Sequence, residues 1–108
     1  MAVQMTKPWV PLADALLELH GNTGVFQLAD AQGEVGYIGM AGGRTLFGLK
    51  GEVRDQSQRL TDMTQVRWEV TTAYHSRYKE LLMVHEAQFG KLPQHNAPVR
   101  LGRISIAD

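Results

Sequence analysis

The sequence predicts a single α+β domain, in the broad α/β class, with a small three-stranded sheet and an extra helix at its N-terminal end. Three observations predict it. The length of 108 residues is close to the common size of one domain. Hydrophobic residues make up 44% and charged residues 20% of the chain, as in ordinary globular proteins. Runs with the two-residue period of strands alternate with runs of helical period. We therefore expect one domain over residues 1–108.

The first part of the chain predicts a helix followed by a β-hairpin. In the segment Pro11–His20, leucines recur at helical spacing, Pro11 suits the first turn, and Gly21 suits the end of the helix. The runs "GVFQLAD" (residues 24–30) and "EVGYIG" (residues 34–39) are both rich in β-forming residues. Only "AQG" separates them, and a short loop with glycine commonly joins hairpin strands. We expect an antiparallel pair.

The next part predicts a helix and then a third strand. Apolar residues from Leu46 to Leu60 fall at helical intervals. Gly48 and Gly51 weaken this helix by roughly 1 kcal/mol each relative to alanine. The run "QVRWEVTT" (residues 65–72) alternates apolar and polar side chains, as a half-buried strand does. These two elements follow the hairpin and can complete a three-stranded sheet.

The last part predicts a long helix and an irregular tail. Residues 73–89 carry a helical stripe of apolar and aromatic side chains that ends before Gly90. The stretch "KLPQHNAP" contains two prolines, so we expect it to be irregular. Residues 99–106, "VRLGRISI", predict either a short final strand or a docked extended tail.

Charge and composition restrict the function. Eleven basic and eleven acidic residues give a formal net charge of zero, whereas nucleic-acid-binding domains usually carry a basic excess. Any contact with nucleic acid must therefore be local. No apolar run approaches the ~20 residues that cross a bilayer, and the first residues lack the features of a secretion signal. The chain has no cysteine, which agrees with a reducing compartment. We expect a cytoplasmic protein without a membrane segment.

The glycine-rich stretch "GEVGYIGMAGGRTLFGLKGEV" (residues 33–53) is not a nucleotide-binding loop. Its first glycines are spaced G-x-x-G-x-x-G, which differs from the dinucleotide fingerprint. No lysine followed by a hydroxyl residue completes a P-loop. We therefore interpret it as a hairpin strand that leads through a turn into a helix.

Four separated pieces of sequence together resemble the GIY-YIG nuclease superfamily. The triplets "GVF" (residues 24–26) and "YIG" (residues 37–39) have the spacing of the two motifs that name this family. Gly24, Phe26, Ile38 and Gly39 then stand at motif positions beside Tyr37. Further along, Glu80 lies in the long predicted helix and Asn96 in "GKLPQHN". The order and approximate distances agree with the family over residues 24–96.

The resemblance implies a nuclease that hydrolyses phosphodiester bonds in DNA or RNA. Such hydrolysis needs an activated water and a cation that absorbs charge on the phosphoryl oxygens. By this resemblance, Glu80 holds a single divalent cation, Mg²⁺ or Mn²⁺. Tyr37 orients or deprotonates the water, which requires a nearby cation to favour the phenolate. Asn96 completes the site. The implied arrangement brings Tyr37, Glu80 and Asn96 into one hollow at an edge of the sheet.

The chain also departs from the family pattern. The first motif has Phe26 where the family has a tyrosine, so the hydroxyl is missing. The family's arginine falls at Phe47 in this chain. If "AGG" is an insertion in the turn, Lys50 or Arg54 takes that role, and both lie on one face of the predicted helix. A lysine does not reproduce the bidentate grip of arginine on phosphate.

Each candidate has an alternative structural role. Tyr37 can be a packed core tyrosine, Glu80 can pair with Arg77 three residues earlier, and Asn96 is a natural turn residue. Lys50 and Arg54 can simply solvate a helix. Two functions stay open. One is the metal-dependent nuclease. The other is a catalytically inactive binding or scaffolding module of the same fold, with an adaptable apolar surface formed by Trp9, Met40, Phe47 and Met63.

Overall fold

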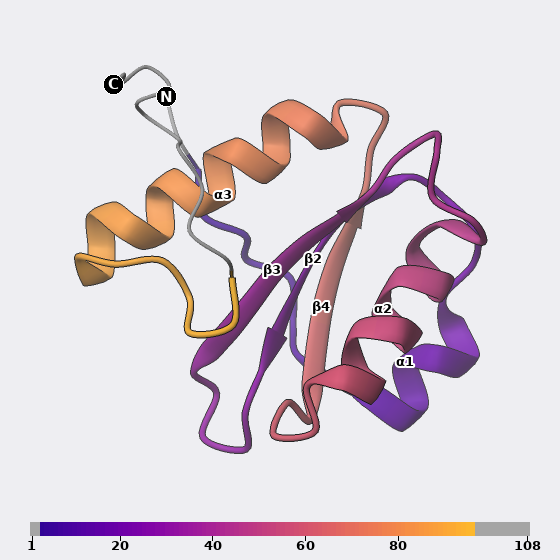
Figure 1. Ribbon diagram of the computed structural model, residues 1–108, viewed down its shortest axis with the longest axis horizontal. Coiled ribbons are helices and arrows are strands. Elements are labelled where there is room, and N and C mark those ends of the chain that lie inside the picture. Colours follow the sequence, from indigo (N-terminus) through magenta and orange to yellow (C-terminus); the bar gives the residue numbers. More distant parts are fainter. Residues whose placement is uncertain (1–2, 97–108) are drawn as a thin grey trace.

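The fold is one four-stranded antiparallel sheet with helices on both faces (Figure 1). The structure is a computed structural model and describes residues 3–96. The α+β class, the hairpin and the order of the main elements are as the sequence predicts, and a short extra strand, β1, extends the sheet. The elements in chain order are β1 (Val10–Pro11), α1 (Leu12–Glu18), β2 (Gly24–Ala29), β3 (Val35–Ala41), α2 (Gly48–Arg59), β4 (Gln65–Val70) and α3 (Tyr74–Phe89). The tail predicted at residues 99–106 lies outside the described residues.

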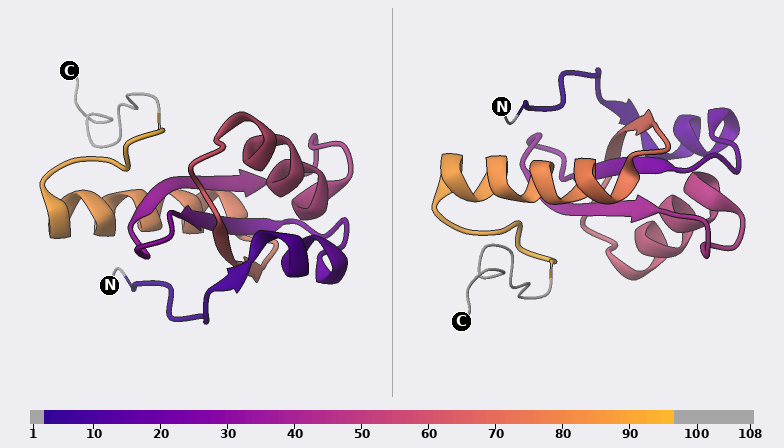
Figure 2. Two further views of the ribbon diagram at one scale, coloured as in Figure 1. Left: turned by 90° about the horizontal axis from the view of Figure 1, so that it is seen from below. Right: turned by 90° about the horizontal axis from the view of Figure 1, so that it is seen from above.

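The sheet separates two layers of helix. Its strand order is β1-β4-β2-β3. Helices α1 and α2 pack on one face and α3 crosses the other, as the two further views also show (Figure 2). Alternate residues of β2 therefore enter different cores: Phe26 and Leu28 face α1 and α2, whereas Val25 faces α3.

Strand β2 is buried along its whole length. It pairs with β3 on one side and with β4 on the other, and all six of its residues are buried. A strand covered on both faces selects apolar residues at successive positions. Gln27 is the exception, because it is a polar side chain with only 5% of its surface exposed.

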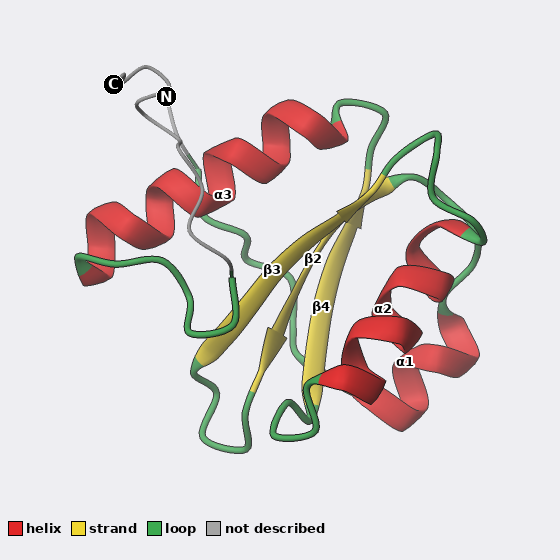
Figure 3. Cartoon of the chain, in the orientation of Figure 1, coloured by secondary structure: helices red, strands yellow, loops and turns green. Residues whose placement is uncertain are grey.

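The loop after α3 covers the free edge of β3 (Figure 3). Strand β3 carries an irregularity at its start, where Leu28 pairs with Tyr37 but Ala29 pairs with Val35. Gly36, the residue skipped by this shift, accepts a hydrogen bond from the backbone N–H of His95 at 2.8 Å. An exposed strand edge otherwise invites pairing with other chains.

The turn into α2 uses two successive residues in the left-handed region. Phe47 has φ 66° and Gly48 has φ 57°. A Cβ atom at Gly48 would overlap the backbone of Gly21, so the close approach requires glycine. Backbone bonds from Leu49 to Asn22 and from Lys50 to His20 hold the two loops together. Helix α2 therefore begins at Gly48, two residues after the predicted start.

Among residues 3–96, no helix has both the length and the apolar character needed to cross a lipid bilayer.

Candidate functional site

Tyr37, the predicted catalytic tyrosine, packs on the sheet face that α1 and α2 cover. Its ring lies 5.9 Å from that of Phe26, and the Arg59 guanidinium lies 5.9 Å from the Tyr37 ring centroid. Burial raises the pKa of the Tyr37 phenol, Tyr78 and Glu52 raise it further, and Arg59 opposes the rise. Tyr37 is therefore a neutral phenol near pH 7, which does not suit a general base.

Glu80, the predicted metal ligand, is held by protein donors. Its Oε1 atom pairs with Nη1 of Arg77 at 2.6 Å, and its Oε2 atom accepts the Val3 backbone N–H at 3.1 Å. This is the pairing at a spacing of three residues that the sequence offered as the alternative role. The same guanidinium binds Glu69 through Nε at 2.8 Å and Nη2 at 3.0 Å.

The surroundings of Glu80 do not fit a divalent cation. Glu69, Glu80 and Arg77 line a shallow depression, and the guanidinium lies between the two carboxylates, where a cation would have to bind. Within residues 3–96, no group of three or more histidine, cysteine, aspartate or glutamate side chains is arranged to hold a metal ion. Both carboxylates are thus already paired with Arg77.

Asn96 is engaged in holding the edge of β3. Its Oδ1 atom accepts the Ile38 N–H at 2.9 Å, and its Nδ2 atom donates to the Ile38 carbonyl, also at 2.9 Å. The side-chain amide thereby replaces the two bonds that a neighbouring strand would make. Because both polar atoms are occupied, Asn96 has a structural role at this edge.

Lys50 and Arg54 lie on the exposed surface of α2. Lys50 is exposed, and Arg54 lies 3.6 Å from Asp55 and 5.8 Å from the Phe47 ring centroid. The arginine beside Tyr37 is Arg59, which sequence reasoning missed. The sequence gives no signal for this contact, because it depends on how α2 packs against β3.

The other motif positions are explained by packing. A Cβ atom at Gly24 would overlap the backbone carbonyl of Glu69, and one at Gly39 would lie 2.5 Å from the Phe26 ring. Phe26 and Ile38 are fully buried, in the cores on opposite faces of the sheet. These residue types are therefore required by the fold itself.

The structure does not bring Tyr37 and Glu80 together. Tyr37 belongs to the core under α1 and α2, whereas Glu80 lies on α3 beside Glu69, across the sheet. Asn96 lies at the edge of β3, and Glu80 lies beside β4, which is separated from β3 by β2. The apolar surface considered for a binding module is also divided, because Met63 is only 4% exposed while Phe47 is 63% exposed.

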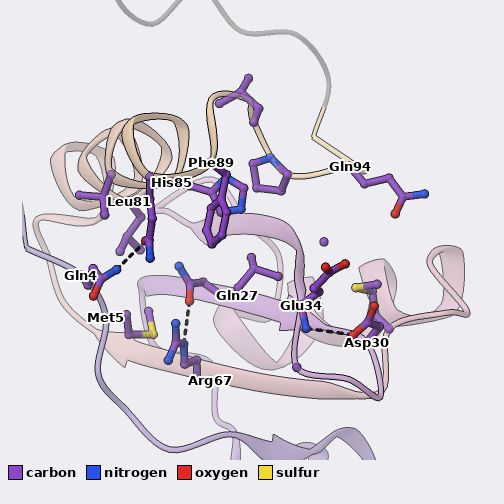
Figure 4. Close-up of a pocket in the computed structure, with 18 of the residues that line it drawn as sticks. Gln4, Met5, Gln27, Asp30, Glu34, Arg67, Leu81, His85, Phe89 and Gln94 are labelled. Atoms are coloured by element: carbon purple, nitrogen blue, oxygen red, sulfur yellow. Dashed lines mark hydrogen bonds between the residues drawn. The ribbon is translucent and has the colours of Figure 1, made fainter.

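A pocket of about 450 Å³ opens between α3 and the sheet (Figure 4). The segment before β1 and the loop after α3 complete its walls. The lining residues are Gln4, Met5, Trp9, Gln27, Asp30, Gly33, Glu34, Val35, Gly36, Met63, Arg67, Leu81, Val84, His85, Gln88, Phe89, Lys91, Leu92, Pro93 and Gln94.

Gln27 and Arg67 lie together at the floor of this pocket (Figure 4). The Arg67 Nε atom donates to Gln27 Oε1 at 2.7 Å, and the guanidinium lies 4.3 Å from the Trp9 ring centroid. Since a guanidinium only donates, this bond fixes which end of the Gln27 amide is oxygen. The Nε2 amide group of Gln27 then points toward α3 and donates to no group among the described residues.

Arg67 carries a positive charge that the described residues leave without an ion pair. Burial lowers the pKa of the Arg67 guanidinium and Glu69 opposes this, but an arginine stays charged at neutral pH. Glu69 cannot neutralise it fully because both of its oxygens bind Arg77. The floor of the pocket is therefore a partly buried cation beside an unpaired amide donor.

The two ends of the pocket differ in chemistry (Figure 4). At one end, His85 Nδ1 donates to the Lys91 carbonyl at 3.0 Å, and the His85 ring packs at a tilt against Phe89, with the ring centroids 4.6 Å apart. At the other end are Asp30 and Glu34. Asp30 Oδ1 accepts the backbone N–H of Glu34 at 2.9 Å. The pocket thus has an aromatic end and an acidic end.

Sequence reasoning did not single out Gln27, Arg67 or Trp9 as site residues. One signal could have indicated Gln27, because it stands within the apolar run from Val25 to Ala29. A glutamine inside a fully buried strand needs a partner or a ligand. The pairing of Gln27 with Arg67 depends on the strand register, which the sequence does not state.

Comparison with known proteins gives a family but no function. The family described as "Domain of unknown function (DUF7508)" matches residues 3–88, which is most of the chain. No curated protein matches the sequence.

Proposed function

We propose that this chain, which belongs to the DUF7508 family of domains of unknown function, is a non-catalytic module that binds a small molecule in the pocket beneath α3. The observation that carries this proposal is the unpaired amide donor of Gln27. The side chain is 5% exposed, and the amide nitrogen reaches the pocket without a partner among residues 3–96.

The Gln27 amide nitrogen is open to the pocket, because no fully buried side-chain nitrogen or oxygen of the described residues lacks a hydrogen-bond partner. Its two N–H groups are therefore available to a bound ligand or to water. The pocket volume of about 450 Å³ falls within the range of small-molecule sites. Its walls combine apolar side chains with a few polar groups, which is the usual composition of such sites.

A metal-dependent nuclease that acts on DNA or RNA is the competing proposal. The order of hairpin, helix, strand and helix supports it, as does the resemblance over residues 24–96. The neutral phenol of Tyr37 and the pairing of Glu80 with Arg77 weigh against it. A role for Mg²⁺ or Mn²⁺ and a nucleic-acid partner belong to the nuclease proposal. A cytoplasmic location is proposed for either function.

A fragment screen followed by backbone amide shifts tests the binding proposal. We expect a subset of fragments to shift the amides of residues that line the pocket. Val84→Trp fills the pocket from α3 and should abolish these shifts. Met83→Trp is the matched control, because Met83 is the neighbouring residue, is 53% exposed and does not line the pocket. Binding by the Met83→Trp variant should be unchanged.

Two outcomes would contradict the proposal. One is a screen in which no fragment shifts the pocket amides, and the other is a set of hits that persists in Val84→Trp. A plasmid and RNA cleavage assay with Mg²⁺ and Mn²⁺ tests the nuclease separately. Metal-dependent cleavage that is lost in Glu80→Gln would favour the nuclease over the binding module.

A further inference from the structure

We infer that the ligand of this pocket carries one anionic group, a carboxylate or a phosphate, that binds Arg67 and Gln27 while an apolar body lies against Met5 and Leu81. This inference rests on the proposed function and specifies the chemical class of the ligand. It derives from the free donors, the uncompensated charge and the distribution of charge along the pocket.

The free donors of Arg67 define the head-group site. The Nε atom is occupied by Gln27, and Trp9 lies against the guanidinium. Nη1 and Nη2 make no hydrogen bond to any group of residues 3–96. Two free guanidinium N–H groups can bind the two oxygens of a carboxylate or phosphate through a pair of parallel hydrogen bonds.

Gln27 extends this row of donors. Its oxygen is turned to Arg67, so the nitrogen is the atom left for a ligand. The floor of the pocket therefore offers donors from two side chains and no free acceptor from either. A ligand group that itself needs an acceptor, such as an ammonium, would find no partner at this floor.

The charge of Arg67 selects an anion over a neutral acceptor. A partly buried cation without a counter-ion is destabilising, and an anionic ligand removes that cost. The nearby acids cannot do so. Glu69 is bound by Arg77, and Asp30 accepts backbone N–H groups of Gln32 and Glu34.

The remaining lining sets the size and net charge of the ligand. Met5 and Leu81 are buried at 3% and 1% exposure and provide an apolar wall, while Phe89 at the aromatic end is 57% exposed. Asp30 and Glu34 stand at the far end (Figure 4). A second negative group on the ligand would be repelled by them. The site therefore fits a molecule with one acidic head and an apolar or aromatic body.

The test uses four probes that share one phenyl ring: benzoate, phenyl phosphate, benzamide and benzylamine. We expect benzoate, phenyl phosphate or both to shift the Gln27 side-chain amide and the Arg67 Nε–H signal. Comparison of these two distinguishes a carboxylate from a phosphate ligand. Benzamide should bind at least tenfold more weakly than the better anion, and benzylamine should not bind.

Arg67→Gln should weaken binding of the better anion at least tenfold and leave the weak binding of benzamide unchanged. Benzamide binding, together with an unchanged amide spectrum away from the pocket, shows that the variant is folded. Lys79→Gln is the matched control, because it removes the same charge at an exposed position on α3 that does not line the pocket. It should change anion binding less than threefold.

The outcomes separate the two proposals. If benzamide binds as tightly as the anions, or if Arg67→Gln leaves anion binding unchanged, the inference about the anion is overturned and the binding module stands. The same holds if the four probes fail while other fragments occupy the pocket. If no fragment occupies the pocket at all, both the binding module and the anion inference fall.

Discussion

At the scale of single residues, Arg77 connects three parts of the chain. Its guanidinium binds Glu69 on β4, Glu80 on α3 and the backbone carbonyl of Val3. Only 15% of the side chain is exposed. A buried guanidinium whose donors are used in this way fixes the orientation of α3 against the sheet. It also explains why Glu80 is a structural side chain in this fold.

The Arg77 site should make stability depend on pH in the acid range. The hydrogen bonds from Arg77 lower the pKa of Glu69 below its ordinary value, with burial opposing. A carboxyl group with a lowered pKa stabilises the fold above its unfolded pKa, and this stabilisation is lost as the pH falls through the folded pKa. Glu69→Gln should therefore lower the free energy of unfolding by about 1–2 kcal/mol at pH 7.

This difference should shrink as the pH decreases below about 4.5, where the unfolded carboxyl begins to protonate. Urea unfolding of both proteins between pH 3 and pH 7 measures it. Glu86→Gln, at an exposed position on α3, is the control and should change stability by less than about 0.5 kcal/mol. A difference between wild type and Glu69→Gln that is constant over this range would contradict the account.

Part of the Arg77 site follows from the sequence. The spacing of three residues between Arg77 and Glu80 on a predicted helix indicates their pairing directly. The second partner, Glu69, could not be inferred in this way. It lies on β4, and it meets Arg77 because α3 turns back across the sheet. Sequence periodicity thus indicates contacts within one element but not those between elements.

At the scale of elements, the free edge of β3 depends on one side chain. Asn96 makes two hydrogen bonds to Ile38, and His95 makes a backbone bond to Gly36. Asn96→Asp keeps the shape but replaces the donor with a carboxylate oxygen that faces the Ile38 carbonyl. We expect a loss of about 1–3 kcal/mol in unfolding free energy, together with greater aggregation at high concentration.

Urea unfolding and light scattering measure these effects. Gln94→Glu is the matched control, because Gln94 is exposed in the same loop and the change adds the same charge. Its stability should stay within about 0.5 kcal/mol of wild type. If Asn96→Asp and Gln94→Glu behave alike, Asn96 does not hold the edge.

Helices and strands could be predicted where the periodic pattern of apolar residues extends over enough positions to be recognised. Strand β4 and helix α3 occur at the predicted positions, since each carries a regular pattern over many residues. Strand β1 was missed because the two residues Val10 and Pro11 cannot show a period. The start of α2 was misplaced because Phe47 adopts a left-handed conformation, which is uncommon for any residue other than glycine, asparagine or aspartate.

At the scale of the whole molecule, the sheet that contains the buried strand β2 separates two hydrophobic cores. The core under α1 and α2 contains the motif residues Phe26 and Tyr37, and the core under α3 adjoins the pocket. The two β-forming runs and the short glycine-containing loop between them correctly predicted the hairpin. Motif spacing along the chain could not show on which face each side chain lies, because that depends on register and on the irregularity in β3. The pocket combines residues from both ends of the described chain, so its formation depends on the complete fold.

The separation of Tyr37 from Glu80 can be measured as an absence of energetic coupling. Residues more than roughly 7–10 Å apart with no shared partner change stability additively, within about 0.5 kcal/mol. The unfolding free energies of Tyr37→Phe, Glu80→Gln and the double variant should therefore give a coupling energy below this value. Glu69→Gln and Glu80→Gln share Arg77 and serve as the positive control, for which we expect about 1 kcal/mol or more. Coupling between Tyr37 and Glu80 as large as that of the control would mean that the two side chains share a site, and would restore the arrangement that a nuclease requires.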